Sequence, residues 1–67
     1  MLNIKELRKA QGMTQEQLAK LIGVTQGAIS QWEEGLTHPA FSKLRKLATA
    51  LGVTMDDLIG EEVEHAS

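Results

Sequence analysis

Apolar residues recur at intervals of three and four along most of the chain, the spacing at which side chains share one face of an α-helix. No stretch shows the strict apolar and polar alternation that indicates a strand. We therefore predict an all-α fold. Five helices are expected, covering residues 4–11, 15–22, 26–34, 41–51 and 55–59.

Capping residues and glycines mark the ends of these helices. Thr14 precedes Gln17 by three residues, and Thr54 precedes Asp57 by three, which is the spacing of a reciprocal capping box. The other expected caps are Asn3 and Thr25, and the expected stops are Gly12, Gly23, Gly35 and Gly52.

The helical pattern also predicts which side chains face inward. They are aliphatic residues with one tryptophan and one phenylalanine, enough for a single small core. The expected members are Ile4, Leu7, Leu18, Ala19, Leu21, Ile22, Ala28, Ile29, Trp32, Phe41, Leu44, Leu47, Ala48 and Leu51, with Met55, Leu58 and Ile59 as the apolar side of the last helix.

Two helices open in the same way, with Thr14-Gln15 and Thr25-Gln26, eleven residues apart. Between them only Gly23-Val24-Thr25 joins the second helix to the third, which is too short for antiparallel packing but suits a sharp turn with crossed axes. This spacing is that of a helix-turn-helix, whose second helix can enter the major groove of DNA.

The outward face of the helix from Gln26 to Glu34 carries amide, hydroxyl and glycine groups, namely Gln26, Gly27, Ser30 and Gln31. A glutamine can pair with the N6 and N7 edge of adenine, and a glycine permits close approach of the backbone. The alternative is that these side chains are simply hydrated polar residues, as on many helices.

Charge is distributed unevenly along the 67 residues, whose formal net charge is −2. All seven Lys and Arg lie between Lys5 and Lys46, where the balance is +3, and the part from Val53 onward carries five acids and no base. Only the first part suits a phosphate backbone. We predict a DNA-binding domain over residues 1–60 and an acidic, disordered tail over residues 61–67.

Several kinds of chemistry find no support in the sequence. There is no cysteine, and His38 and His65 have no metal-ligand spacing, so neither a metal site nor a cofactor is predicted. No serine has a base at a suitable spacing, which argues against an enzyme. No small-molecule ligand is evident. The charged N-terminus and the lack of a long apolar run predict a cytoplasmic protein without membrane contact.

Two stretches, "GMTQEQLAKLIGVTQGAISQWEEG" and "LRKLATALGVTMDDLI", resemble the Cro and phage-repressor type of helix-turn-helix domain, also called Xre-like, over residues 2–59. The resemblance implies a compact five-helix, lambda-repressor-like bundle that binds double-stranded operator DNA, usually as a two-fold dimer. It also implies that Gln15 contacts a phosphate and braces Gln26, and that Gln26 reads an adenine. The remaining expected DNA contacts are Thr25, Gly27, Ser30, Gln31 and Lys43.

The chain departs from this family pattern at two places. Gly27 stands where several phage relatives have a second base-reading side chain. The loop "LTHPA" before the fourth helix lacks the Lys and Arg frequent in those relatives, and His38 is its only possible cation. The sequence therefore does not predict readout of the minor groove by this loop.

Arg8 lies one turn after Ile4, on the stripe that faces the core, while Glu33 lies at the edge of the buried side of its helix. A partly buried Arg8–Glu33 pair would remove the cost of burying either charge alone, and the resemblance implies the same pair. The alternative is that Arg8 extends to solvent.

The function that these observations favour is a sequence-specific transcriptional regulator, a repressor, acting as a homodimer that forms either in solution or only on DNA. The expected dimer contact uses Met55, Leu58 and Ile59, although these residues could instead close the core. The alternative function is an interaction module of the same fold, such as an antitoxin or antirepressor, whose main partner is a protein.

Overall fold

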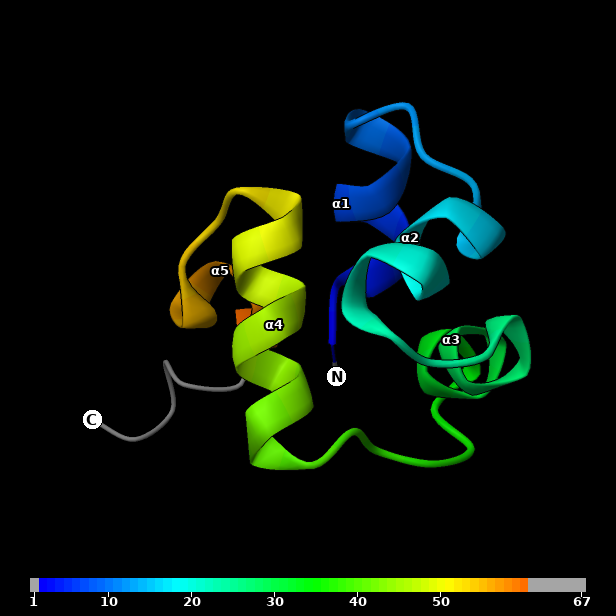
Figure 1. Ribbon diagram of the computed structural model, residues 1–67. Coiled ribbons are helices and arrows are strands. Elements are labelled where there is room, and N and C mark those ends of the chain that lie inside the picture. The colour runs from blue at the N-terminus through cyan, green and yellow to red at the C-terminus, as the bar shows by residue number, and fades with distance from the viewer. Residues whose placement is uncertain (1, 61–67) are drawn as a thin grey trace.

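Five helices account for most of residues 2–60, which are the residues that the computed structural model describes (Figure 1). They are α1 Ile4–Ala10, α2 Gln15–Ile22, α3 Gln26–Glu34, α4 Phe41–Leu51 and α5 Met55–Ile59. No strand occurs in this range, so the predicted all-α, five-helix fold is confirmed. The predicted tail, residues 61–67, lies outside the described residues.

Helix α2 packs against both α3 and α4, and α4 contacts three other helices, α1, α2 and α5 (Figure 1). Helix α1 contacts α3 and α4, and α5 packs on α4. The buried side chains come from all five helices and form one cluster: Ile4, Leu18, Ala19, Ile22, Ile29, Leu47, Ala48, Leu51 and Leu58. None of the helices within residues 2–60 is both long and apolar enough to cross a membrane.

The two predicted capping boxes are present. The Thr14 hydroxyl accepts a hydrogen bond from the Gln17 backbone N–H at 3.0 Å, and the Gln17 side chain accepts one from the Thr14 N–H at 2.9 Å. Thr54 and Asp57 make the equivalent pair at 3.0 and 3.2 Å. These bonds satisfy backbone donors that the first turn of a helix leaves without partners.

The predicted capping role of Asn3 is wrong, although α1 begins where expected. The Asn3 side chain makes no capping bond; its amide donates instead to the carbonyl oxygen of Asp57 at 3.1 Å. The Asn3 backbone N–H donates to the carbonyl of Leu58 at 2.9 Å. Asn3 therefore ties the start of the chain to α5.

Two residues expected in the core are exposed. Leu21 is 61% exposed and Phe41 is 68% exposed. At about 100° per residue, Leu21 points about 100° away from the centre of the face formed by Leu18, Ala19 and Ile22. Phe41 is the first residue of α4, and its side chain points toward the helix start, where no turn precedes it.

Candidate nucleic-acid interface

The turn between α2 and α3 is built by three residues. Gly23 ends α2 with φ +79°, a left-handed conformation that favours glycine. Val24 is half-buried against the core, and the Thr25 hydroxyl accepts a hydrogen bond from the Ala28 N–H at 3.1 Å. The second helix therefore begins immediately after the turn and packs across the first.

Helix α3 has one buried and one polar face. Ile29 is fully buried, and Ala28 and Trp32 are half-buried on the same side. On the other side Gln26, Gly27 and Gln31 are exposed, and Ser30 is half-buried. Among these four outward residues there is no ionic group, so the face offers uncharged donors and acceptors, which suit base edges rather than phosphates.

Glycine is not required at position 27 by the fold. A Cβ added there would meet only the Thr25 hydroxyl, at 3.9 Å, which is ordinary contact. The position lies inside the first turn of α3, where glycine costs roughly 0.5–1 kcal/mol relative to alanine. What the glycine provides is open space on the polar face, next to Gln26.

The two glutamines that open α2 and α3 are in contact. The Gln26 amide donates to Gln15 Oε1 at 3.3 Å, and the Gln15 amide donates to Glu33 Oε1 at 3.0 Å. Gln26 is exposed, whereas Gln15 is half-buried. Because Gln15 is held at both ends of its amide group, it limits the orientations available to Gln26.

Glu33, which accepts the hydrogen bond from Gln15, forms an ion pair with Arg8. Arg8 Nε and Nη2 donate to the two carboxylate oxygens of Glu33 at 2.7 and 3.2 Å, and Arg8 Nη1 donates to the carbonyl of Met13 at 2.8 Å. The side chains of Arg8 and Glu33 are only 9% and 3% exposed. This bidentate pair joins α1 to α3 and fixes the carboxylate that accepts the Gln15 hydrogen bond.

The environment of Glu33 keeps it ionised. Burial raises the pKa of its carboxyl, but the hydrogen bonds from Arg8 and Gln15, with the positive charges of Arg8 and Lys5, outweigh burial and hold the pKa below its ordinary value. A charged acceptor is therefore available to Gln15 at neutral pH.

The remaining predicted site residue, Lys43, lies apart from this group. It is half-buried in the first turn of α4, and no hydrogen bond joins it to another side chain among residues 2–60. The structure thus brings together Arg8, Gln15, Gln26 and Glu33, and places Thr25, Gly27, Ser30 and Gln31 on or beside the same helix.

One contact at this surface was missed by the sequence reasoning. The Thr37 hydroxyl donates to Gln31 Oε1 at 3.4 Å, so the loop after α3 also orients one of the outward glutamines. A threonine six residues after a glutamine is not a recognisable signal, because the contact depends on how the loop folds back. Within residues 2–60 no group of three or more His, Asp or Glu side chains could hold a metal ion.

The sequence was also compared with models of known protein families. A family model described as helix-turn-helix matches residues 4–58. The chain belongs to the helix-turn-helix family. A search of curated proteins finds the HTH-type transcriptional activator BcrR of Enterococcus faecalis, 39% identical over 61 residues. This match covers 90% of the chain but 30% of BcrR, so the chain spans about a third of the length of such a relative.

Two solved helix-turn-helix structures are also similar. The P22 c2 repressor, in complex with a synthetic operator, superposes with a TM-score of 0.80 at 38% identity, covering 85% of this chain and 86% of that one. The restriction-modification controller protein C.AhdI of Aeromonas hydrophila has a TM-score of 0.74 at 36% identity, with 78% and 79% covered. The fold is therefore that of the lambda-repressor-like helix-turn-helix domains.

Proposed function

We propose that the chain is a sequence-specific DNA-binding regulator of transcription, a repressor, that places α3 in the major groove of an operator. The observation that carries this proposal is the uncharged polar face of α3 with Gln26 held by Gln15. In this role Gln26 reads an adenine, while Gly27, Ser30 and Gln31 lie against neighbouring bases or phosphates. The P22 c2 repressor, a similar protein, is bound to an operator in its structure.

The backbone contacts in this proposal come from residues beside that face. Gln15 contacts a phosphate while it braces Gln26, and Thr25 and Lys43 supply further contacts that fix the position of the domain without reading sequence. No step of this function is enzymatic, and we place it in the cytoplasm.

Selection of bound duplexes from a random DNA pool tests the function directly. The expected result is enrichment of one motif with two-fold symmetry and half-sites about one helical turn apart. The same selection with a Gln26→Ala variant is the control, and it should lose the base preference at one position of each half-site. Failure of the wild-type protein to enrich any motif would contradict the proposal and favour the protein-binding alternative.

We propose further that two copies bind together. One domain presents a single short recognition helix, and two copies on one operator gain affinity through effective concentration. The dimer contact predicted from the sequence needs revision, because Leu58 is fully buried in the core. Met55 and Ile59 are half-buried and remain as the apolar groups of α5 that can contact a second copy.

An Ile59→Asp variant tests this contact. In sedimentation experiments with and without the selected operator, the wild type should bind as two domains per duplex. The Ile59→Asp variant should bind as one domain per duplex, or much more weakly. Asp56→Ala on the exposed side of α5 is the matched control and should behave as wild type. Equally tight two-to-one complexes for Ile59→Asp would mean that the interface lies elsewhere.

A further inference from the structure

A groove runs between α2 and α4, apart from the polar face of α3. Its volume is about 660 Å³. The residues that line it include Leu21 and Ile22 from α2, and Arg45, Lys46, Thr49 and Ala50 from α4. Gln15, Gln26 and Lys43 do not line it, but Ser42 does, and Lys43 lies one turn before Lys46 on α4, so the groove adjoins the proposed backbone contact at one end.

Leu21 is the prominent apolar side chain of this surface. It also lines a second hollow, of about 540 Å³, with Gln11, Gly12, Met13, Gln17 and Lys20. Leu21 is therefore a ridge between two hollows, and it is 61% exposed. A single exposed leucine is common on protein surfaces, but one flanked by hollows on both sides can be covered by another chain.

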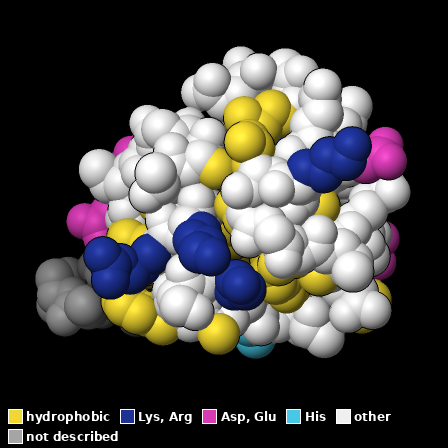
Figure 2. All heavy atoms as spheres, viewed as in Figure 1, with side chains coloured by type: hydrophobic (Ala, Val, Ile, Leu, Met, Phe, Trp, Pro, Cys, Tyr) yellow, Lys and Arg dark blue, Asp and Glu magenta, His cyan; other side chains and the backbone are white. Residues whose placement is uncertain are grey.

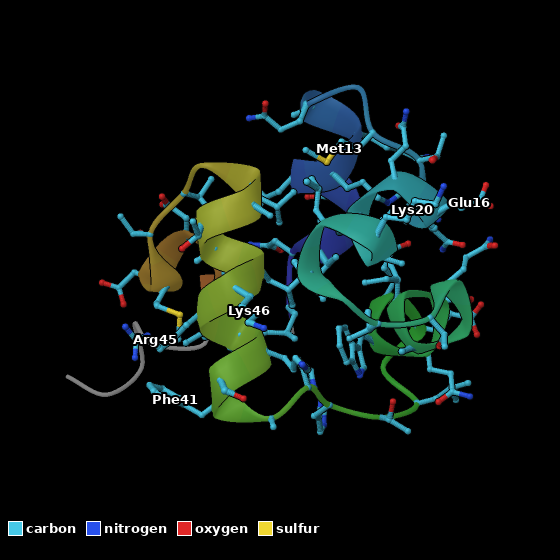
Figure 3. All side chains as sticks on the ribbon, viewed as in Figure 1. Met13, Glu16, Lys20, Phe41, Arg45 and Lys46 are labelled. Atoms are coloured by element: carbon cyan, nitrogen blue, oxygen red, sulfur yellow. The ribbon has the colours of Figure 1, made fainter. Side chains whose placement is uncertain are left out.

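The charge of the two hollows has one sign. The ionisable residues that line them are Lys20, Arg45 and Lys46, all exposed, and no acidic residue lines either hollow. Glu16, one turn before Lys20 on α2, lines neither. Figure 2 shows dark-blue Lys and Arg side chains beside apolar atoms at the lower left of this face and one at the upper right beside an acidic side chain, and Figure 3 shows Lys20 and Lys46 on α2 and α4, with Glu16 next to Lys20.

We propose that this surface, formed by Leu21 with the cations Lys20, Arg45 and Lys46, binds an acidic amphipathic segment of a protein partner. An apolar side chain of the partner packs against Leu21 and the half-buried Ala50, and carboxylates on either side meet the cations. A helix lying in a groove with its apolar face inward is a common mode of such recognition.

A DNA backbone fits this surface less well than a protein segment. Phosphates could meet the three cations, but a phosphate backbone offers no apolar group to cover Leu21. The surface also excludes Gln15 and Gln26, which the proposed function assigns to DNA. A partner bound here could therefore be held beside an operator while α3 remains free.

Synthetic peptides of defined chemistry serve as probes. The first is a 16-residue helical peptide with leucines along one face, spaced at three and four, and glutamates on both flanks of that face. The second replaces each glutamate by lysine, and the third replaces each leucine by alanine. Fluorescence anisotropy with the full chain should detect one-to-one, salt-sensitive binding of the first peptide only. Equal binding of the lysine peptide, or no binding of any peptide, would overturn the proposal.

Paired substitutions locate the site. Leu21→Ser should weaken binding of the acidic peptide by about tenfold, while Leu36→Ser, at a leucine 68% exposed outside both hollows, should not change it. Lys46→Glu should likewise weaken binding of the acidic peptide, while the control Lys9→Glu on α1 should not. Circular dichroism verifies that each variant is folded. Equal losses for the Leu21 and Leu36 variants would show that the peptide does not use the groove.

The experiment also separates this proposal from DNA binding. The peptide should bind even if no operator is found, and with saturating operator it should still bind in a ternary complex, because α3 does not line the groove. If Lys46→Glu instead leaves peptide binding unchanged, weakens binding to all duplexes alike and lowers the salt dependence by about one charge, the cation contacts phosphate. In that case the assignment of this surface to a protein partner is wrong.

Discussion

Replacement of Glu33 by alanine should be the most damaging single change among the polar residues of the candidate interface. Glu33 accepts hydrogen bonds from Arg8 Nε, Arg8 Nη2 and the Gln15 amide, and its side chain is only 3% exposed. Without it, Arg8 keeps one bond, to the carbonyl of Met13, and its positive charge stays buried. An unpaired buried charge of this kind costs about 3–5 kcal/mol.

That loss is large for a domain of this size. A folded chain of 67 residues has a free energy of unfolding of about 3–10 kcal/mol at typical values per residue. Glu33→Ala should therefore lose from about a third to all of the free energy of unfolding, and urea titration followed by circular dichroism should be carried out at low temperature so that a folded baseline remains. The neighbouring Glu34→Ala is the matched control, since Glu34 is exposed, and should change stability by less than about 0.5 kcal/mol.

A rescue variant separates loss of pairing from loss of packing. Arg8→Met combined with Glu33→Leu removes both charges and keeps apolar volume, so it should regain most of the stability lost in Glu33→Ala. Refutation would come from a Glu33→Ala domain destabilised by no more than the Glu34→Ala control. Such a result would mean that water solvates Arg8 when its partner is removed.

Three further outcomes are expected. The pKa of Glu33 in the folded state is lowered from 4.5, so its contribution to stability is complete above pH 4.5 and is lost as the pH falls through the folded-state pKa. In urea titrations, the free energy of unfolding should therefore decrease less on acidification for the Arg8→Met, Glu33→Leu variant than for the wild type. Gln26→Ala should cost about 1–3 kcal/mol on the selected operator and little on random DNA, and equal losses on both would exclude base reading. Gly27→Ala should raise the free energy of unfolding by roughly 0.5–1 kcal/mol and the melting temperature by a few degrees, yet weaken operator binding; unchanged binding would mean that nothing approaches α3 closely there.

The helix boundaries could be predicted because their causes are local. At a helix start, a threonine and an acceptor three residues later can exchange two hydrogen bonds without a partner from elsewhere in the chain, and Thr14 with Gln17 does so here. The ends at Gly23 and Gly35 depend likewise on a single left-handed residue. Asn3 is the exception, because a partner from α5 competes for its side chain.

Which apolar residues are buried was predicted less well. Both Leu21 and Phe41 fit the helical spacing, yet the face that each helix buries is decided by the neighbours it meets. The contacts of the candidate site have the same origin. The link from Gln26 through Gln15 to Glu33 joins residues 11 and 18 positions apart, and it forms only because the turn at Gly23 crosses the two helices.

The two hydrogen bonds from Asn3 to α5 have a consequence for the connectivity of the domain. Its backbone N–H and side-chain amide hold the carbonyls of Leu58 and Asp57, so residue 3 and the end of α5 are neighbours in space. A Cβ on Gly60 would lie 2.7 Å from the Asn3 amide nitrogen. The described part of the chain, residues 2–60, thus nearly closes on itself, and a short linker from Gly60 to residue 2, with a new opening in the exposed loop at Thr37, should yield a circular permutant with the same five helices.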